Sequence, residues 1–486
     1  MSLSPRRRNR ASPIKDWAGV VSFTPNQRFA PHDLNELTAI LTNVLHGKPG
    51  NSLAILGSHH SCSGIFQSNI ILETNKLPVK FTATPLPNGL GYAVAASAYM
   101  RVGEFLSKAA ELNLSLTSLG GTDAQTLAGL ISTNTAGATS RHGIYEIVDW
   151  VEYLTVAADK QSIEFRRALR ADPEFRAVIC SLGAIGFLTR IGFSLVEERF
   201  YEGTFEIKSL KEVLTDVAET SRRYEFWRIE WIPKHEQGLF WSAKRLPPDA
   251  KPTDDYPPDI AESILKWSHE INGIIFRDNI FYNAGWEAVY GLLLSSYQTT
   301  TTRGPMRNII PCDRHTTLRV AMAEWSFDPA DLGRVMTACR TYFGKNRWPN
   351  LPIEIECAPI DNYLMSPWNW PDLGTSYIMK FNFQYLVEHI DDRNRKLMLR
   401  HLEGLWKYLE AEGIPFKAHW AKINFLTPEI VARNYDLKSF MPYVQPMFLS
   451  DSMRGKLIGS RLKSHRAGIR SAAALKSGYG SAAGKV

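Results

Sequence analysis

The first two hundred residues alternate short apolar runs with turn-forming residues. Residues 52–56 and 69–73 are compact apolar runs of the kind that form buried strands. Residues 102–112 instead repeat their apolar positions at helical spacing and predict a helix. Residues 148–157 and 185–196 again predict strands. This alternation indicates a mixed domain of helices and strands.

From about Phe200 the pattern changes to aromatic-rich strands that alternate with amphipathic helices. The predicted strands are 226–232, 239–242, 317–325, 353–357 and 376–383, and the predicted helices are 329–342 and 395–412. Residues 247–258, rich in Pro and Asp, predict a surface loop. The pattern favours an antiparallel sheet with helices on one face. The predicted fold class is therefore α+β.

Length and composition narrow the class of protein. A chain of 486 residues is too long to fold around one ordinary hydrophobic core, so two or three domains are expected. Its 44% apolar and 22% charged residues are typical of a soluble globular protein. The five cysteines are scattered without CxxC spacing, which argues against a disulfide framework and a zinc site. No apolar run approaches the roughly 20 residues that span a bilayer, and no secretory signal is visible. We expect a cytoplasmic protein with no metal site and no transmembrane segment.

The net charge of +7 belongs to the two ends of the chain. Residues 1–15 and 454–486 together hold thirteen Lys and Arg and no acidic residue, and without them 43 basic residues face 49 acidic ones. The ends predict solvated tails, or contacts with an acidic partner or a membrane surface. Neither end interleaves aromatic residues with its charges, so we expect no nucleic-acid partner.

Three segments of small residues predict a site for a polar ligand. Residues 57–61 follow a predicted strand and read Gly-Ser-His-His-Ser, so successive N–H groups can point at phosphate oxygens. Residues 118–143 and 181–189 are rich in Gly, Ser and Thr. Tight turns explain any one of these segments, but they explain all three in one domain less well. No GxGxxG joins a strand to a helix, so the pattern is not that of a doubly wound dinucleotide domain of the usual kind.

In this order the three segments resemble the FAD domain of the vanillyl-alcohol oxidase superfamily. Lys417-Ala-His419-Trp-Ala421-Lys422 resembles the His-Trp-Gly-Lys signature of its sugar-lactone oxidases. The resemblance implies a two-subdomain FAD-binding domain of the PCMH type and an antiparallel substrate domain. The implied FAD-binding residues are Gly57, Ser58, His59, His60, Ser61, Ser118, Gly120, Gly129, Thr133, Thr135, Gly137, Gly186 and Ile191. His60 falls where relatives attach FAD covalently, and a noncovalent contact with phosphate is the alternative.

The resemblance also implies a division of the chain. Its segments are a disordered basic N-terminus (1–13), the FAD-binding domain (14–197), the substrate domain (198–415), a C-terminal segment that returns to the active site (416–455) and a disordered basic tail (456–486).

Four residues are the catalytic candidates: Glu354, Glu356, His419 and Lys422. Glu354 and Glu356 lie two apart, so on a strand both face one side. A solvated sheet edge is the alternative reading of this pair. His419 and Lys422 follow on the predicted last strand, where three-residue spacing turns them to opposite faces unless a bulge intervenes.

The chain departs from the family pattern at three positions. Glu356 stands in place of an Arg, Ala421 in place of the signature Gly, and Ala136 in place of a His. A carboxylate at 356 reverses the local charge unless a cation pairs with it. Glu356 therefore also raises the hypothesis of an amine-bearing substrate.

The implied function is oxidation of a hydroxyl-bearing carbon of a sugar lactone, polyol or sugar-like molecule by hydride transfer to the flavin. Lys422 is the first candidate for the base that accepts the hydroxyl proton, and Glu354 or Glu356 orients the substrate. Oxygen is the expected acceptor. The alternatives are a dehydrogenase with another electron acceptor, a tailoring oxidase for an amino-bearing substrate and a flavoprotein without activity.

Overall fold

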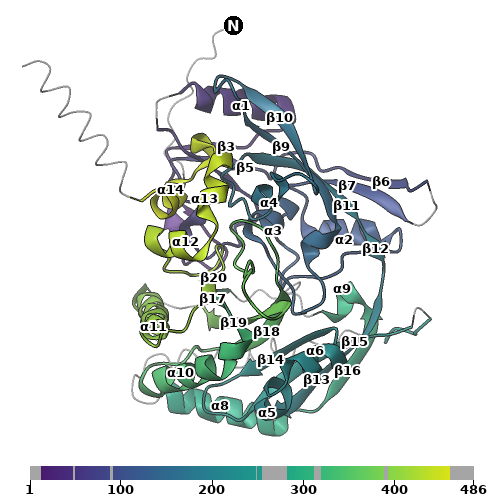
Figure 1. Ribbon diagram of the computed structural model, residues 1–486, viewed down its shortest axis with the longest axis vertical. Coiled ribbons are helices and arrows are strands. Elements are labelled where there is room, and N and C mark those ends of the chain that lie inside the picture. Colours follow the sequence, from purple (N-terminus) through teal and green to yellow (C-terminus); the bar gives the residue numbers. More distant parts are fainter. Residues whose placement is uncertain are drawn as a thin grey trace, which may run out of the picture.

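The computed structural model describes residues 12–47, 50–87, 91–247, 249–253, 282–310, 319–387 and 392–459. Its two parts lie one above the other along the long axis (Figure 1). The upper part holds the N-terminal strands and helices together with the last helices of the chain, and the lower part is built around a large antiparallel sheet. The α+β fold class is confirmed.

A small parallel sheet carries the first of the three small-residue segments. Its strands lie in the order β3 (Gln27–Phe29), β5 (Ile70–Glu73), β4 (Leu53–Leu56). Helix α1 (Leu34–Leu45) begins at Asp33, whose carboxylate accepts hydrogen bonds from the N–H groups of Asn35 and Glu36. Strand β4 is apolar and buried, and it ends where Gly57 begins the loop.

A five-stranded antiparallel sheet forms the rest of the upper part's framework. In spatial order it contains β10 (Ile163–Leu169), β9 (Val148–Val156), β11 (Phe187–Ser194), β7 (Tyr92–Ser97) and β6 (Phe81–Pro85). Helices α2 (Val102–Ala110), α3 (Leu127–Thr133) and α4 (Phe175–Val178) accompany it. Two strand pairs complete this part: β1 (Ile14–Lys15) with β2 (Ser22–Phe23), and β8 (Leu114–Ser115) with β12 (Val196–Glu197).

The lower part is an eight-stranded sheet. Its spatial order is β16 (Thr300–Pro305), β13 (Phe200–Ser209), β15 (Gln237–Arg245), β14 (Phe226–Trp231), β18 (Ile353–Pro359), β19 (Tyr377–Leu386), β17 (Val320–Phe327) and β20 (Lys417–Ala418). Its helices are α5 (Leu210–Leu214), α6 (Val217–Arg223), α8 (Tyr282–Ser296), α9 (Met306–Ile309), α10 (Leu332–Lys345) and α11 (Asp392–Ala411). In Figure 1, α5, α8 and α10 lie below the sheet, away from the upper part.

Side chains of this sheet alternate between an apolar face and a polar face. On β18, Ile353 and Ile355 are fully buried, whereas Glu354 and Glu356 point to the opposite side. On β17, Trp325 packs against Trp406 of α11 with ring centroids 5.4 Å apart. The apolar face is therefore covered by helices, and the polar face is left to line a cavity toward the upper part.

The chain returns to the upper part after β20. Helices α12 (Pro428–Asn434), α13 (Leu437–Phe440) and α14 (Asp451–Leu457) lie there beside the N-terminal segments (Figure 1). Ser52 donates to the carboxylate of Asp451 at 2.6 Å, and Ser450 donates to the carbonyl of Ile65 at 2.6 Å. The last helices of the chain and its N-terminal segments thus fold as one body.

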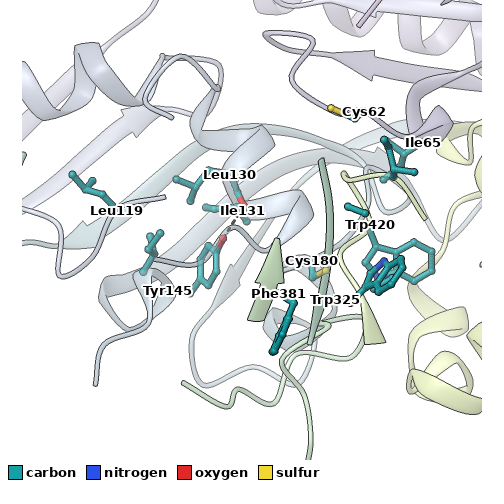
Figure 2. Packing of buried hydrophobic residues seen from close by; sticks show 14 of the residues in the cluster. Cys62, Ile65, Leu119, Leu130, Ile131, Tyr145, Cys180, Trp325, Phe381 and Trp420 are labelled. Carbon is teal, nitrogen blue, oxygen red and sulfur yellow. Dashed lines mark hydrogen bonds between the residues drawn. The ribbon is translucent and has the colours of Figure 1, made fainter. Parts of the chain in front are cut away.

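The apolar core crosses from one part to the other. Figure 2 shows Leu130, Ile131 and Tyr145 of the upper part near Phe381 and Trp325 of the lower sheet. The Tyr145 hydroxyl donates to the carbonyl of Leu130 at 2.7 Å, which satisfies a buried polar group.

Two predictions about the C-terminal region are wrong. The last strand ends at Ala418, so His419 to Lys422 form a turn and not a strand. The disordered tail does not begin at residue 456, because Lys456 lies on α14 and donates to the side-chain oxygen of Asn424 at 2.5 Å. The rest of the predicted tail, from 460, lies outside the described residues, as do 1–11 of the predicted N-terminus and residues 248 and 254–258 of the predicted surface loop.

In the described part of the chain, no helix combines the length and apolarity needed to span a membrane. The described residues also include no group of three or more His, Cys, Asp or Glu side chains arranged to hold a metal ion.

Candidate active site

A cavity of about 380 Å³ lies between the small-residue loops of the upper part and the polar face of the eight-stranded sheet. Most of the predicted site residues line it together: Gly57, Ser58, His59, His60, Ser61, Gly120, Gly129, Thr133, Thr135, Gly137, Gly186, Glu354, Glu356, His419 and Lys422. The size is that of a small-molecule site. Residues more than 350 positions apart in sequence therefore meet in one place.

The 57–61 loop presents backbone donors to this cavity. In the described structure, no hydrogen bond uses the N–H groups of Ser58, His59, His60 or Ser61. His59 has a φ of 63°, a left-handed conformation that turns the chain sharply. Unpaired successive N–H groups in such a turn form a concave site for an anion.

His60 is held as a neutral imidazole. Burial and the nearby charge of Lys422 lower its pKa to about 4. Its ring stacks on Trp17 with centroids 5.4 Å apart. The orientation of His60 is therefore set by packing against the N-terminal strand region.

The second small-residue segment packs too tightly to accept side chains. A Cβ on Gly137 would lie 2.2 Å from the Ser118 hydroxyl and 2.5 Å from the Leu119 carbonyl oxygen. A Cβ on Gly57 would lie 2.7 Å from the Thr126 hydroxyl, which caps α3 by accepting from the Gly129 N–H. Without side chains, Gly57 and Gly137 let the backbone pack closely against Thr126 and against residues 118–119 at the cavity wall.

Two predicted FAD contacts do not line the cavity. Ser118 is fully buried behind Gly137, and its hydroxyl has no partner among the described residues. Ile191 is buried in β11, where it pairs with Ala96 on one side and Val151 on the other. The resemblance implied that both contact the cofactor, but neither residue is part of the cavity lining.

The residues present fit a flavin dinucleotide. The upper wall offers backbone donors from the 57–61 loop and from Gly120 and Gly121, whose N–H groups likewise have no partner in the described chain. A Cβ on Gly121 would meet no atom within 4 Å, so the wall is open at this point. We call this surface, residues 57–61 with 120–122, the donor wall.

The opposite surface is formed by side chains of the sheet. We call it the charged wall: Arg228, Glu230, Glu324, Glu354, Glu356 and Asn382. Its residues lie on neighbouring strands at matching positions, with Glu354 opposite both Glu230 and Asn382. Glu354 and Glu356 share one face, so this prediction is confirmed, and the solvated-edge alternative is excluded because β18 lies in the middle of the sheet.

Lys380 supplies the cation that Glu356 requires. The Lys380 ammonium lies 2.8 Å from Oε1 of Glu356, and its side chain is 1% exposed. Burial disfavours the charged lysine, but Glu356 and Glu324 outweigh it and raise the Lys380 pKa above its ordinary value. The Asn382 amide also donates to Glu354 and Glu356, at 3.1 Å each.

The turn after β20 brings His419 and Lys422 to the same cavity. The N–H of His419 donates to the Glu324 carbonyl at 2.9 Å, and the N–H of Lys422 donates to the His419 carbonyl at 3.2 Å. Burial, Lys422 and Lys380 lower the pKa of His419 well below its usual range, so this ring is neutral. The Trp420 indole donates to the Met365 carbonyl at 2.7 Å and anchors the turn.

Sequence reasoning missed Arg228, Glu230, Glu324 and Asn382. Arg228 and Glu230 are polar positions two apart within the predicted 226–232 strand, and this spacing was a usable signal. Glu324 alternates with Ser326 on β17, and Asn382 alternates with Lys380 on β19, but only the pairing of the two strands sets Glu324 beside Asn382.

Comparisons with known proteins agree with this architecture. A model of the D-arabinono-1,4-lactone oxidase family matches residues 191–445. The D-arabinono-1,4-lactone oxidase of Saccharomyces cerevisiae is 30% identical over 258 residues, covering 50% of this chain and 46% of that protein. The enzyme of Yarrowia lipolytica is 26% identical over 237 residues, 48% of this chain and 43% of the relative. The matched region thus spans less than half the length of these curated relatives.

Solved structures share the fold. A solvent-stable cholesterol oxidase superimposes with a TM-score of 0.71 at 14% identity, over 92% of this chain and 97% of that one. Cholesterol oxidase from Brevibacterium sterolicum gives 0.69 at 12% identity, over 92% and 96%. The residues that the family model matches include the charged wall and the 419–422 turn. This chain belongs to the D-arabinono-1,4-lactone oxidase family.

Proposed function

We propose that this chain is an FAD-dependent oxidoreductase that oxidises a hydroxyl-bearing carbon of a sugar lactone, polyol or sugar-like molecule. One observation carries the proposal: a wall of unpaired backbone donors and a wall of acid–base side chains enclose the same cavity. Membership of a lactone oxidase family supports the reaction class.

The donor wall would hold the cofactor. The N–H groups of Ser58 to Ser61 suit the pyrophosphate, and Gly120, Gly129, Thr133, Thr135 and Gly137 would lie along the rest of the molecule. When bound, the flavin supplies the hydride acceptor for the substrate carbon. The protein's task is to position that carbon and to exclude water.

Lys422 would accept the hydroxyl proton. Its ammonium nitrogen has no hydrogen-bond or ion-pair partner in the described chain, and its side chain lines the cavity half-buried. A lysine without such partners is available to contact the substrate hydroxyl. Glu354 and Glu356 would orient the substrate hydroxyls, since each is already fixed by Asn382.

His60 would attach the cofactor covalently. Its imidazole is neutral, as a nucleophile must be, and it lines the cavity beside the donor loop. Acid precipitation tests this part: the pellet retains the flavin if the link is covalent, and a colourless pellet refutes it. FAD binding itself does not depend on the result.

Anaerobic titration of the purified protein tests the function. We expect D-arabinono-1,4-lactone or another lactone or polyol in a panel to bleach the flavin absorbance, and admission of oxygen to restore it with formation of peroxide. Reoxidation only by an added carrier or dye would make the protein a dehydrogenase. A flavin that no member of the panel bleaches would refute oxidation of this substrate class.

A further inference from the structure

Three of the four carboxylates on the charged wall already have cationic partners. Arg228 lies 3.2 Å from Glu230 and 3.1 Å from Glu354, and Lys380 lies 2.8 Å from Glu356. Glu356, the residue that raised the hypothesis of an amine-bearing substrate, is therefore neutralised by the protein itself. An amine site must be sought elsewhere on this wall.

Glu324 is the carboxylate without such a partner. Its side chain lines the cavity with the residue only 8% exposed, and no hydrogen bond or ion pair reaches its carboxylate from the described residues. Its two oxygens are not among the fully buried side-chain atoms without a partner, so they face the open cavity, where an entering ligand takes the place of water. The unpaired oxygens of Glu324 point to a ligand that donates.

A second acceptor lies beside it. Asn382 is directly opposite Glu324 in the β17–β19 pairing, so the two side chains share a face. The Asn382 amide nitrogen donates to Glu354 and Glu356, which fixes the amide orientation. Its Oδ1 is buried with no partner among the described residues. Two neighbouring acceptors thus lack donors.

Lys422 does not remove this deficit during the proposed reaction. Its ammonium makes no ion pair of 4 Å or less with Glu324 in the described structure. The Glu324 carboxylate therefore accepts no hydrogen bond from Lys422.

We propose that the substrate carries a protonated primary amine, seated against Glu324 and Asn382. An ammonium group has three N–H donors and one positive charge, which match two donor-free acceptors, one of them a carboxylate that shares the charge of Lys380 with Glu356. A hydroxyl offers a single donor and no charge. The inference rests on the proposed function, because it names the substrate class of that same cavity.

Calorimetric titration of the FAD-loaded protein tests the inference without turnover, provided that the flavin is first reduced with dithionite. The probes are D-sorbitol and 1-amino-1-deoxy-D-sorbitol, which differ in one hydroxyl-to-amine exchange. We expect the amine to bind at least about tenfold more tightly in the wild type. In Glu324→Gln, which keeps the size and a hydrogen-bonding amide, this ratio should fall to near one.

Glu236→Gln is the matched control, since it removes the same charge at a side chain that is 74% exposed and outside the cavity. It should keep the wild-type ratio. Equal affinities in the wild type, absence of binding by both probes, or an undiminished ratio in Glu324→Gln would each overturn the inference. Failure of the proposed function is a separate result: no FAD bound, or no bleaching by any lactone, polyol or aminopolyol.

Discussion

The two walls of the cavity are built on opposite principles. The donor wall uses backbone N–H groups and glycines and carries no carboxylate, whereas the charged wall uses side chains of both signs on a regular sheet. Backbone donors do not depend on which side chain a residue carries, and successive N–H groups suit phosphate oxygens. Side-chain charges change with single substitutions, and they suit selection of a substrate.

The largest expected effect is at the turn between the walls. Lys422→Met keeps the length of the side chain and removes its basic nitrogen, so flavin reduction by a lactone or polyol should fall about 10²- to 10⁴-fold. The bound FAD should remain, because the donor wall is unchanged. Stopped-flow reduction at saturating substrate measures the rate. A reduction rate near that of the wild type would remove Lys422 from the role of base.

Removal of the buried Lys380 ammonium should lower the stability of the charged wall. Lys380→Met leaves Glu356 without its ion pair in a buried position, and we expect about 3–5 kcal/mol lower stability. Urea unfolding measures the free energy. The double variant Lys380→Met/Glu356→Gln is the control, and it should recover part of the loss. A single variant as stable as the wild type would show that the pair contributes little.

Alanine substitutions at two glycines of the upper part distinguish a glycine required for packing from one that leaves room for a ligand. Gly137→Ala places a Cβ 2.5 Å from a backbone carbonyl oxygen, which should lower stability by about 1–3 kcal/mol. Gly121→Ala points a Cβ into open space, so it should leave unfolding nearly unchanged but weaken FAD retention. Thermal unfolding and flavin content after gel filtration measure both. The donor wall is misassigned if Gly121→Ala binds FAD as the wild type does.

The smallest predicted effect concerns Asp361, whose carboxyl group lies outside the cavity lining. Asp361 accepts hydrogen bonds from Asn134 at 2.8 Å and Ser366 at 2.7 Å, and burial raises its pKa to about 6. Between pH 4 and 6 the folded state then binds more protons than the unfolded state. Stability should therefore fall as pH rises through this window, by up to about 1 kcal/mol per pH unit.

Urea unfolding of wild type and Asp361→Asn at several pH values measures this slope. The variant cannot titrate at this position, so it should lose the contribution. An identical slope in the two proteins would assign the pH dependence to other groups.

Sequence patterns predicted the parts of this site that depend on local periodicity. The alternation in residues 353–357 correctly set Glu354 and Glu356 on one face, and the small-residue segments located most of the cavity lining. Periodicity does not contain strand order, so the Lys380–Glu356 pair and the position of Glu324 opposite Asn382 became visible only with the sheet.

The errors have equally physical causes. The turn at His419 is stabilised by the Glu324 carbonyl and by the buried Trp420 indole, which are tertiary contacts that no local spacing encodes. Lys456 belongs to a basic, small-residue stretch that resembles a tail, yet its half-buried side chain donates to Asn424. Long-range packing decided both cases.

A crystal structure of the FAD-loaded protein with an unreactive polyol tests the division of the two walls most directly. The account predicts that the pyrophosphate accepts from the N–H groups of Ser58 to Ser61 and that the polyol lies between Lys422 and the charged wall. Cofactor phosphates against the charged wall, or a polyol bound outside this cavity, would contradict it.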